Sequence, residues 1–295
     1  MPRCAFLTMD SLDEFEVYDD LLIKPLSQIG WSVDMVSWRD RQVDWNTFEA
    51  VIIRSPWDYQ QDAQLFMQVL EEIDQSSARL ENPLDLVKWN IDKTYLRELE
   101  QEGILIVPTL WGRRLEAEQL DKAFEQLDTR ELVIKPTVSA NADDTFRVKQ
   151  EVKLQTKREM LRTFYDRAYM IQPFMKSIVT EGEFSLFYFG GEYSHTILKT
   201  PGKGDFRVQE EHGGILASVE PETKLLKRAQ QTMARLQPQP LYARADYVRT
   251  EDDDFALMEL ELIEPSLYFN MDPESPRRFA RIFDRWMEEK RKEAI

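Results

Sequence analysis

The first third of the sequence alternates short apolar strands with helices, and this alternation leaves few folds open to the chain. Residues 4–8, 31–38 and 50–54 have the composition of strands. AVIIR at 50–54 is a continuous apolar run, typical of a parallel strand that is covered on both faces. Apolar residues at helical spacing separate the first two strands, and a second helix is expected over 61–77. The pattern predicts a small doubly wound α/β domain over residues 1–88.

The rest of the chain predicts two further units, an α+β lobe over 89–170 and a mostly antiparallel lobe over 171–295. In the first lobe, a strand at 132–135 is expected to form a hairpin with a partner at 146–149. The other expected strands lie at 104–107, 169–172, 183–189, 192–199, 241–248 and 255–262. Further helices are expected at 115–127, 157–166, 223–235 and 276–291, and one more is expected to end at 101. The whole is an α/β (α+β) protein.

Charge and cysteine content exclude several classes of protein. A formal net charge of −16 argues against general affinity for nucleic acids or anionic membranes, because phosphate backbones favour basic surfaces. Cys4 is the only cysteine, so no disulfide framework is expected and a reducing compartment is indicated. The N-terminus is unlike a signal peptide, and no apolar run approaches the roughly 20 residues of a membrane span. We expect a cytoplasmic protein with a small-molecule partner, and self-association stays open.

Two neighbouring strands near the end of the chain place carboxylates in the middle of a sheet. Alternation puts Glu259 and Glu261 on one face of the last strand, and antiparallel pairing brings Asp246 close to them. Such carboxylates repel one another by roughly a few kcal/mol at an effective dielectric of about 20, so a cation should lie between them. Hard oxygen ligands in this arrangement suit Mg²⁺ that is shared with phosphates. A solvated strand face paired with Arg244 and Arg249 is the alternative.

A second set of residues is cationic. Lys135 follows three apolar residues of a strand that ends at Pro136, and a buried lysine needs an anion such as a polyphosphate. Lys93, Lys199 and Arg207 come from separate predicted elements, and each taken alone is equally well interpreted as a surface cation. Together they predict a site for a small anionic ligand.

The loop after Lys135 also offers groups to phosphate. Thr137, Ser139 and Thr145 supply hydroxyls, and the backbone supplies N–H groups. Neither P-loop nor Rossmann glycine spacing occurs in the sequence, so phosphate binding here does not depend on those motifs.

YMIQPFMKS at 169–177 is a strand that ends in a polar amide and apolar side chains. Free backbone groups beyond such a strand suit an adenine ring. An ordinary core strand end is the alternative.

RSPWDY at 54–59 follows the third strand of the N-terminal domain. Ligands collect at the carboxyl ends of strands in doubly wound sheets, which places this loop at a functional edge. Arg54, Trp57, Asp58 and Tyr59 are its candidate side chains. A turn with a hydrophobic plug is the alternative.

These motifs, in this order, resemble the ATP-grasp superfamily over roughly residues 80–275. The resemblance implies the ATP-grasp fold, with a doubly wound N-terminal domain and two α+β lobes, and it implies ATP and Mg²⁺ as cofactors. The implied ATP-binding residues are Lys93, Lys135, Ser139, Gln172, Phe174, Met175, Glu183 and Lys199. The implied catalytic residues are Lys135 and Arg207, and the implied metal ligands are Asp246, Glu259 and Glu261.

Within the superfamily the chain looks similar to the D-cycloserine synthetase-like group, which is related to glutathione synthetase. In that group the N-terminal domain helps to bind the acceptor, so Arg54, Trp57, Asp58 and Tyr59 are implied substrate residues. Two positions depart from the superfamily pattern. Glu261 stands where the superfamily usually has asparagine, and the loop after Lys135 lacks the usual glycines.

The implied reaction is an ATP-dependent ligation through an acylphosphate on an amino-acid-like substrate, with release of ADP. The protein's contribution would be positioning and charge neutralisation. The residues do not distinguish a cyclo-ligase, which closes one substrate into a ring, from an intermolecular dipeptide or glutathione-type ligase. A nucleotide-binding regulator or a kinase without ligase activity is a further alternative.

Overall fold

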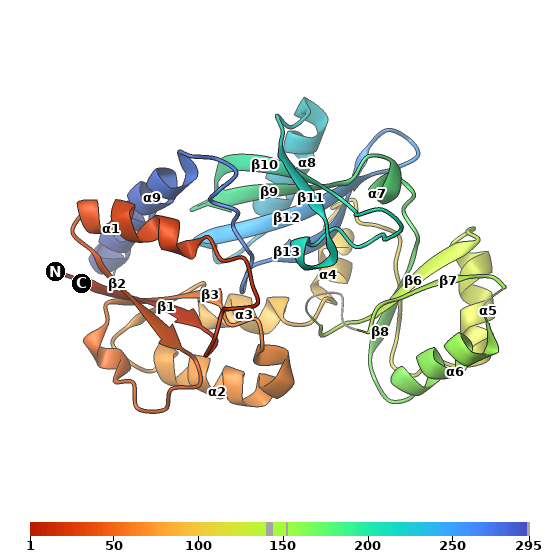
Figure 1. Cartoon of the computed structure of the whole chain (residues 1–295), viewed down its shortest axis with the longest axis horizontal. Coiled ribbons are helices and arrows are strands. Elements are labelled where there is room, and N and C mark those ends of the chain that lie inside the picture. The colour runs from red at the N-terminus through yellow and green to blue at the C-terminus, as the bar shows by residue number, and fades with distance from the viewer. Residues whose placement is uncertain (140–143, 152, 294–295) are drawn as a thin grey trace.

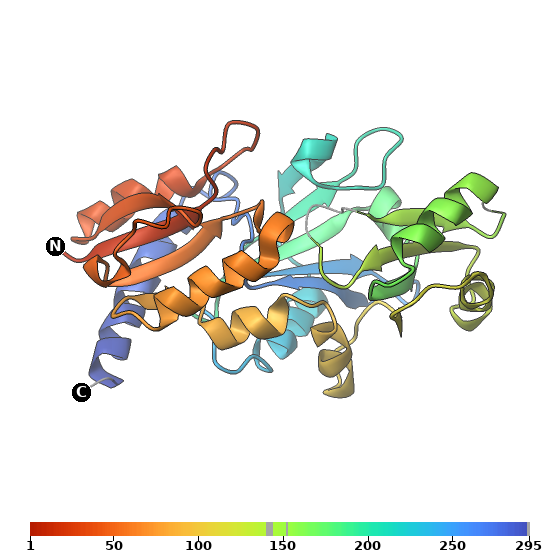
Figure 2. The same ribbon diagram turned by 90° about the horizontal axis from the view of Figure 1, so that it is seen from below.

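The computed structural model describes residues 1–139, 144–151 and 153–293, and three β-sheets make up its framework. Figure 1 shows the N-terminal sheet at one end of the molecule and the lobe of α5 and α6 at the other, with the largest sheet between them. The view from below shows the same order along the long axis (Figure 2). The expected α/β (α+β) class is confirmed.

The N-terminal sheet is fully parallel, as the strand and helix alternation predicts. Its strands run in the order β2-β1-β3-β4. Their bounds are β1 Arg3–Thr8, β2 Ser32–Ser37, β3 Ala50–Ser55 and β4 Arg79–Glu81. β4 is three residues long, too short to show a periodic pattern in the sequence. The two inner strands are buried on both faces, which explains their continuous apolar runs.

Helices cover both faces of this sheet. On one face, a 3₁₀ turn at Asp19–Leu22 and α1 (Ile23–Gln28) pack on Phe6 and Ile52. On the other face, α2 (Ala63–Asp74) and α3 (Leu84–Asn90) pack on the alternate residues of the same strands. The sequence predicts a first helix that ends at Gly30 and is interrupted at Pro25, whereas the structure has a 3₁₀ turn followed by a short α-helix that contains Pro25. α3 has no counterpart in the sequence analysis.

The lobe after α4 (Tyr95–Gln101) contains a four-stranded antiparallel sheet in the order β5-β8-β6-β7. Its elements are β5 Leu110–Gly112, α5 Ala117–Gln126, β6 Glu131–Pro136, β7 Phe146–Lys149, α6 Leu154–Thr163 and β8 Tyr169–Pro173. The β6–β7 hairpin is confirmed. The predicted strand at 104–107 is wrong, because only an isolated bridge joins Ile106 to Leu257. Ile104 and Ile106 instead fill the core beneath the next sheet.

The largest sheet is five-stranded, with the order β11-β10-β9-β12-β13. Its strands are β9 Glu183–Phe189, β10 Glu192–Thr200, β11 Ile215–Ser218, β12 Tyr242–Arg249 and β13 Phe255–Glu261. One short helix, α7 (Ser177–Thr180), precedes it, and α8 (Thr223–Met233) lies between β11 and β12. Its two faces differ. One packs apolar side chains against α4 and α8, and the other carries charged side chains in mid-sheet.

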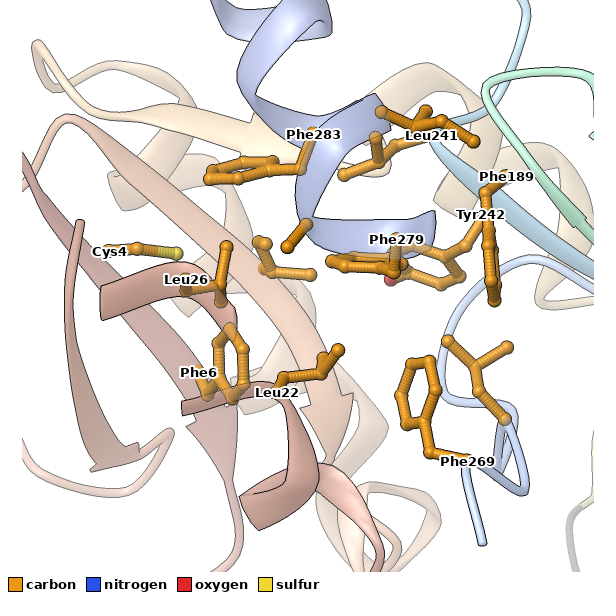
Figure 3. Close-up of a cluster of buried hydrophobic side chains, with 14 of the residues drawn as sticks. Cys4, Phe6, Leu22, Leu26, Phe189, Leu241, Tyr242, Phe269, Phe279 and Phe283 are labelled. Carbon is orange, nitrogen blue, oxygen red and sulfur yellow. The ribbon is translucent and has the colours of Figure 1, made fainter. Parts of the chain in front are cut away.

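The last helix, α9 (Ser275–Glu293), packs between the N-terminal domain and the large sheet. Figure 3 shows Phe279 and Phe283 of this helix between Phe6 and Leu26 of the N-terminal domain and Tyr242 of the large sheet. All of these side chains are buried in one core. The N-terminal sheet is therefore held against the large sheet by an apolar core. Of the helices that the structure describes, none combines the length and the apolar composition needed to cross a bilayer.

Asn82 forms a polar link inside this junction. Its side chain is fully buried, donates to the carbonyls of Tyr242 at 2.9 Å and Leu262 at 2.7 Å, and accepts from the Leu241 N–H at 2.7 Å. We predict that Asn82→Ala lowers the free energy of unfolding by about 3 kcal/mol, because three buried backbone groups lose their partner. Denaturant titration measures this loss. Asn46→Ala, at an exposed turn, is the control, and equal small losses in both variants would contradict the prediction.

Candidate active site

One cavity is lined by side chains from the two antiparallel sheets and from loops, including loops of the N-terminal domain. The nucleotide, catalytic, metal and substrate residues predicted from the sequence contribute widely separated parts of its wall. Lining residues among them are Trp57, Tyr59, Lys93, Lys135, Ser139, Gln172, Phe174, Met175, Glu183, Lys199, Arg207, Glu259 and Glu261. The structure therefore brings together most of the residues that the sequence analysis selects.

The charged face of the large sheet forms the floor of this cavity. The register pairs Arg244 with Glu261 and Asp246 with Glu259, so these four side chains share one face of β12 and β13. Glu259 and Glu261 line the cavity. Asp246 is 2% exposed and does not line the cavity. The predicted proximity of the three carboxylates is confirmed, although Asp246 lies deeper than the other two.

Arg244 is the cation that lies among these carboxylates. Its guanidinium donates to Asp246 from Nε at 3.1 Å and from Nη2 at 3.0 Å, and Nη2 also pairs with Glu261. Arg249, which the alternative interpretation places beside it, instead pairs with Glu181, Glu222 and Asp253. The alternative interpretation is therefore right about Arg244, which pairs with carboxylates of this face. It is wrong about Arg249 and about solvation, because the face is buried. The R-x-D spacing at 244–246, with both side chains on one strand face, was the signal for Arg244.

The two cavity carboxylates have different protonation behaviour. For Glu259, burial is the largest influence and acts upward, but the charges of Lys93 and Lys135 outweigh it and leave the pKa below its ordinary value. For Glu261, burial raises the pKa to about 8, although Arg244 acts in the opposite direction. The neighbouring cations therefore keep Glu259 ionised at neutral pH but do not keep Glu261 fully ionised. A further cation bound at the floor would stabilise the ionised form of Glu261.

Lys93 and Lys199 anchor opposite sides of the floor. Lys93 Nζ lies 3.2 Å from Glu259 and donates to the carbonyl of Ser139 at 2.6 Å, so it ties the loop after β6 to β13. Lys199 Nζ pairs with Glu183 and lies 3.5 Å from Asp246. Both lysines are less than a tenth exposed. Neither is the ordinary surface cation of the alternative interpretation.

Lys135 differs from the other cations of the cavity. It lies at the end of β6, pairs in register with Met170, and no ion pair joins it to any carboxylate that the structure describes. Burial lowers its pKa, and Glu259, Glu183 and Asp246 act in the opposite direction. An unpaired cation that faces a cavity is suited to an anionic ligand.

The predicted adenine site lies at the end of β8. Gln172 is buried and donates to the Thr109 hydroxyl at 3.0 Å, and Phe174 and Met175 continue the wall beyond it. The Arg147 guanidinium lies over the Phe174 ring at 3.5 Å from its centroid. Phe174 is thereby fixed as an apolar wall of the cavity.

Arg207 lies on a loop between β10 and β11. It lines the cavity and forms a salt bridge with Asp205 at 2.8 Å. Phe206, beside it, meets the Phe174 ring edge to face, with centroids 6.1 Å apart. The loop therefore contacts the predicted adenine wall while it presents Arg207 to the cavity.

The RSPWDY loop divides into two groups. Trp57 and Tyr59 line the cavity, but Arg54 and Asp58 do not. Arg54 is fully buried and pairs with Asp19 at 2.8 Å, and Asp58 accepts from Trp38 at 2.7 Å and from Arg39 at 2.8 Å. Both side chains are therefore engaged by protein partners, and neither lines this cavity.

The cavity floor offers two carboxylates to a magnesium ion, which would need phosphate or water oxygens for its remaining ligands. The described residues contain no group of three or more His, Cys, Asp or Glu side chains that could hold a metal ion by themselves. Glu259 and Glu261 nevertheless offer two hard carboxylates beside an unpaired lysine. Mg²⁺ in proteins commonly takes one or two carboxylates and completes its shell with substrate phosphates and water. Asp246 is held by Arg244, Lys199 and Ser185 and does not line the cavity, so it is not among these donors.

The N-terminal domain matches a family model. Residues 4–82 match the model described as the N-terminal domain of D-cycloserine synthetase DcsG. The cycloserine biosynthesis protein DcsG of Streptomyces lavendulae is 29% identical over 278 residues, which is 88% of this chain and 90% of that protein.

Solved structures agree with this match. The crystal structure of D-cycloserine synthetase DcsG superposes with a TM-score of 0.85 at 27% identity, covering 97% of this chain and 99% of the other. D-alanine–D-alanine ligase from Bacillus anthracis, complexed with ATP, has a TM-score of 0.71 at 17% identity, with full coverage of both chains. The resemblance expected from the motifs is confirmed: over most of its length the chain is similar in sequence and in fold to D-cycloserine synthetase DcsG, and it shares its fold with ATP-grasp ligases.

Proposed function

We propose that the chain is an ATP-dependent, ADP-forming ligase that joins a carboxylate to a nitrogen through an acylphosphate. The observation that carries the proposal is the cavity itself, where an unpaired Lys135 faces two carboxylates suited to a metal and an apolar wall suited to adenine. The similarity to D-cycloserine synthetase and to D-alanine–D-alanine ligase supports the same chemistry.

In the first step, a carboxylate oxygen of the substrate attacks the γ-phosphorus of ATP, and the bond to the β-phosphate oxygen breaks to release ADP. Lys93 and Lys135 lie where they can hold the phosphates, because they enter the cavity from the ends of α3 and β6. The adenine would lie against Phe174 and Met175, and Glu183 would accept from the ribose. Positioning of this kind supplies most of the rate enhancement in phosphoryl transfer.

A magnesium ion would be held by Glu259 and Glu261 and would neutralise charge on the phosphates. In the second step, nitrogen attacks the acyl carbon and phosphate leaves. Arg207 and Arg244 are the cavity guanidiniums available to the negative charge that develops there. Arg244 lies on the cavity floor, where its guanidinium contacts both Asp246 and Glu261. No enzyme nucleophile is required.

The substrate is proposed to be a small amino-acid-like molecule. Trp57, Tyr59 and Phe15 line the part of the cavity formed by the N-terminal domain, and they are the proposed contacts of the acceptor. A ring-forming reaction is favoured over an intermolecular one by the similarity to D-cycloserine synthetase across nearly the whole chain. The unit boundaries at 88 and 170, and the cytoplasmic location expected from the cysteine content, stay predictions.

Phosphate release from MgATP across D-alanine, other amino acids, dipeptides and O-ureidoserine tests the proposal, with mass spectrometry of the products. Release with a product lighter than its substrate by water or ammonia indicates a cyclo-ligase. Release with a joined product indicates an intermolecular ligase. A stable phosphorylated product indicates a kinase, and ATP binding without phosphate release across the panel indicates a regulator; either of these two results would overturn the ligase proposal.

A further inference from the structure

We propose that Glu264 accepts the proton of the attacking nitrogen in the second step, and that the RSPWDY loop positions Glu264 for this task. The inference rests on the proposed function and adds a residue that the ATP site does not use. Glu264 lies beyond the end of β13 and lines the cavity on the side of Trp57 and Tyr59.

The backbone around Glu264 is held from the N-terminal domain at two consecutive residues. Trp57 Nε1 donates to the carbonyl of Glu264 at 2.9 Å. Arg54 Nη2 donates to the carbonyl of Pro265 at 3.1 Å, and Asp19 in turn fixes Arg54 at 2.8 Å and 3.0 Å. The loop predicted to touch the substrate therefore fixes the position of another residue at the cavity wall.

The carboxyl group of Glu264 is oriented but not neutralised. Tyr59, which is 4% exposed and packs on Phe66, hydrogen-bonds to this carboxyl through its hydroxyl. Within the described residues no lysine, arginine or histidine forms an ion pair with Glu264. A carboxylate that faces a ligand cavity with one neutral donor keeps acceptor capacity for a proton from the ligand.

The surroundings of Glu264 bring its pKa close to neutral pH. Burial raises the pKa of Glu264 to about 7, with a smaller upward effect from Glu259, while the Tyr59 hydrogen bond and Lys93 lower it. Glu261 and Tyr242 are the other titratable groups that feel its charge. A positive charge bound at Glu259 would lower this pKa and leave Glu264 ionised at neutral pH. A general base is most effective when its pKa is close to the operating pH.

The step balances without a further reactant. The nitrogen lone pair forms the bond to the acyl carbon, the carbon–oxygen bond to phosphate breaks, and phosphate departs with that electron pair. The nitrogen then carries one proton too many, and this proton passes to a Glu264 oxygen. Solvent receives it when the product leaves. The first step transfers no proton to or from nitrogen, so Glu264 has no task there.

Hydroxylamine separates the two steps experimentally. It intercepts an acylphosphate as a hydroxamate and needs little help from a base, because its nitrogen is neutral at pH 7. The probes are O-ureidoserine and D-alanine with MgATP, and the variants are Glu264→Gln, Glu264→Asp, and Glu251→Gln in an exposed turn as the control. Thermal unfolding confirms that each variant is folded.

We expect Glu264→Gln to form product at least 100-fold more slowly than the wild type while hydroxamate formation stays within about threefold. Glu264→Asp should recover part of the loss, and Glu251→Gln should match the wild type. A parallel loss of hydroxamate and product, or an unaffected product rate, would overturn the assignment. If the wild type forms neither ADP nor hydroxamate with either probe, the proposed function fails and this inference fails with it.

Tyr59→Phe tests the positioning role by its pH profile. Removing the hydroxyl removes a hydrogen bond that lowers the pKa of Glu264, so this pKa should rise. Because only the ionised carboxylate accepts a proton, the ascending limb of the product rate should move to higher pH. The position of the pH limb for hydroxamate formation should not move, because that reaction does not use Glu264, whatever the loss of an acceptor contact does to its rate. An unshifted limb would show that Tyr59 does not act through Glu264.

Discussion

Lys135→Ala is expected to lower the rate of ADP formation about 10³-fold, which corresponds to about 4 kcal/mol of lost transition-state stabilisation. Lys135 is the cavity lysine without a carboxylate partner among the described residues, so no ion pair has to break before it contacts the transferring phosphate. The chain should remain folded, because Glu259 keeps Lys93 as its partner when Lys135 is removed. Steady-state ADP release with the best substrate of the panel gives the rate, and denaturant titration gives the stability.

Lys149→Ala is the matched control, because Lys149 lies on the neighbouring strand β7 and its side chain is 76% exposed. It should leave ADP release unchanged. Wild-type turnover in a folded Lys135→Ala chain would refute the nucleotide site. Equal losses in both lysine variants would show that the lobe tolerates no change of charge and would remove the specific role of Lys135.

The long elements of the fold could be predicted from the sequence because their patterns repeat. β9, β10, β12 and β13 alternate or run apolar over seven residues or more, and α8 and α9 show clear helical spacing. Several short elements were not predicted, although the four-residue β7 was predicted as the hairpin partner of β6. Three or four residues, as in β4, β5, β11 and α7, carry no period, and pairing with a neighbouring strand decides their conformation.

The site was predictable where one residue broke a local pattern. Lys135 stands out because it ends an apolar strand, and Glu259 and Glu261 stand out because they alternate with apolar residues in mid-sheet. Arg54 and Asp58 were selected by their place in a loop. A sequence shows that a loop follows a strand, but it does not show which side chains turn back into the domain.

The roles of Glu264 and Arg244 could not be predicted from the sequence, because both depend on tertiary packing. Glu264 follows the alternating strand without any pattern of its own, and only the packing of Trp57 and Tyr59 against it reveals a fixed carboxyl at the cavity. Arg244 was visible as a strand residue, but its partners depend on the register between β12 and β13. Register is a tertiary property, since a shift of one residue would turn every side chain to the opposite face.

Arg244→Met is expected to lower the free energy of unfolding by about 3–5 kcal/mol and to reduce product formation about 10³-fold. Arg244 is the shared partner of Asp246 and Glu261, and removing it leaves charge in a buried face. Burial raises the pKa of Asp246, but Arg244 and Lys199 outweigh it and leave that pKa below its ordinary value. Without Arg244 this carboxyl therefore loses part of what keeps it ionised in the folded chain. Denaturant titration and product analysis measure the two losses.

A double-mutant cycle with Asp246→Asn separates the lost ion pair from lost packing. If the buried charge is the cause, the double variant should be about 1–3 kcal/mol more stable than the sum of the single losses predicts. Arg249→Met is the matched control, because Arg249 lies on the same strand but is more exposed and pairs away from the cavity. It should lose about 1 kcal/mol and keep the rate of product formation. Additive losses in the cycle would mean that Arg244 supports the floor by its packing, and that the carboxylates do not depend on its charge.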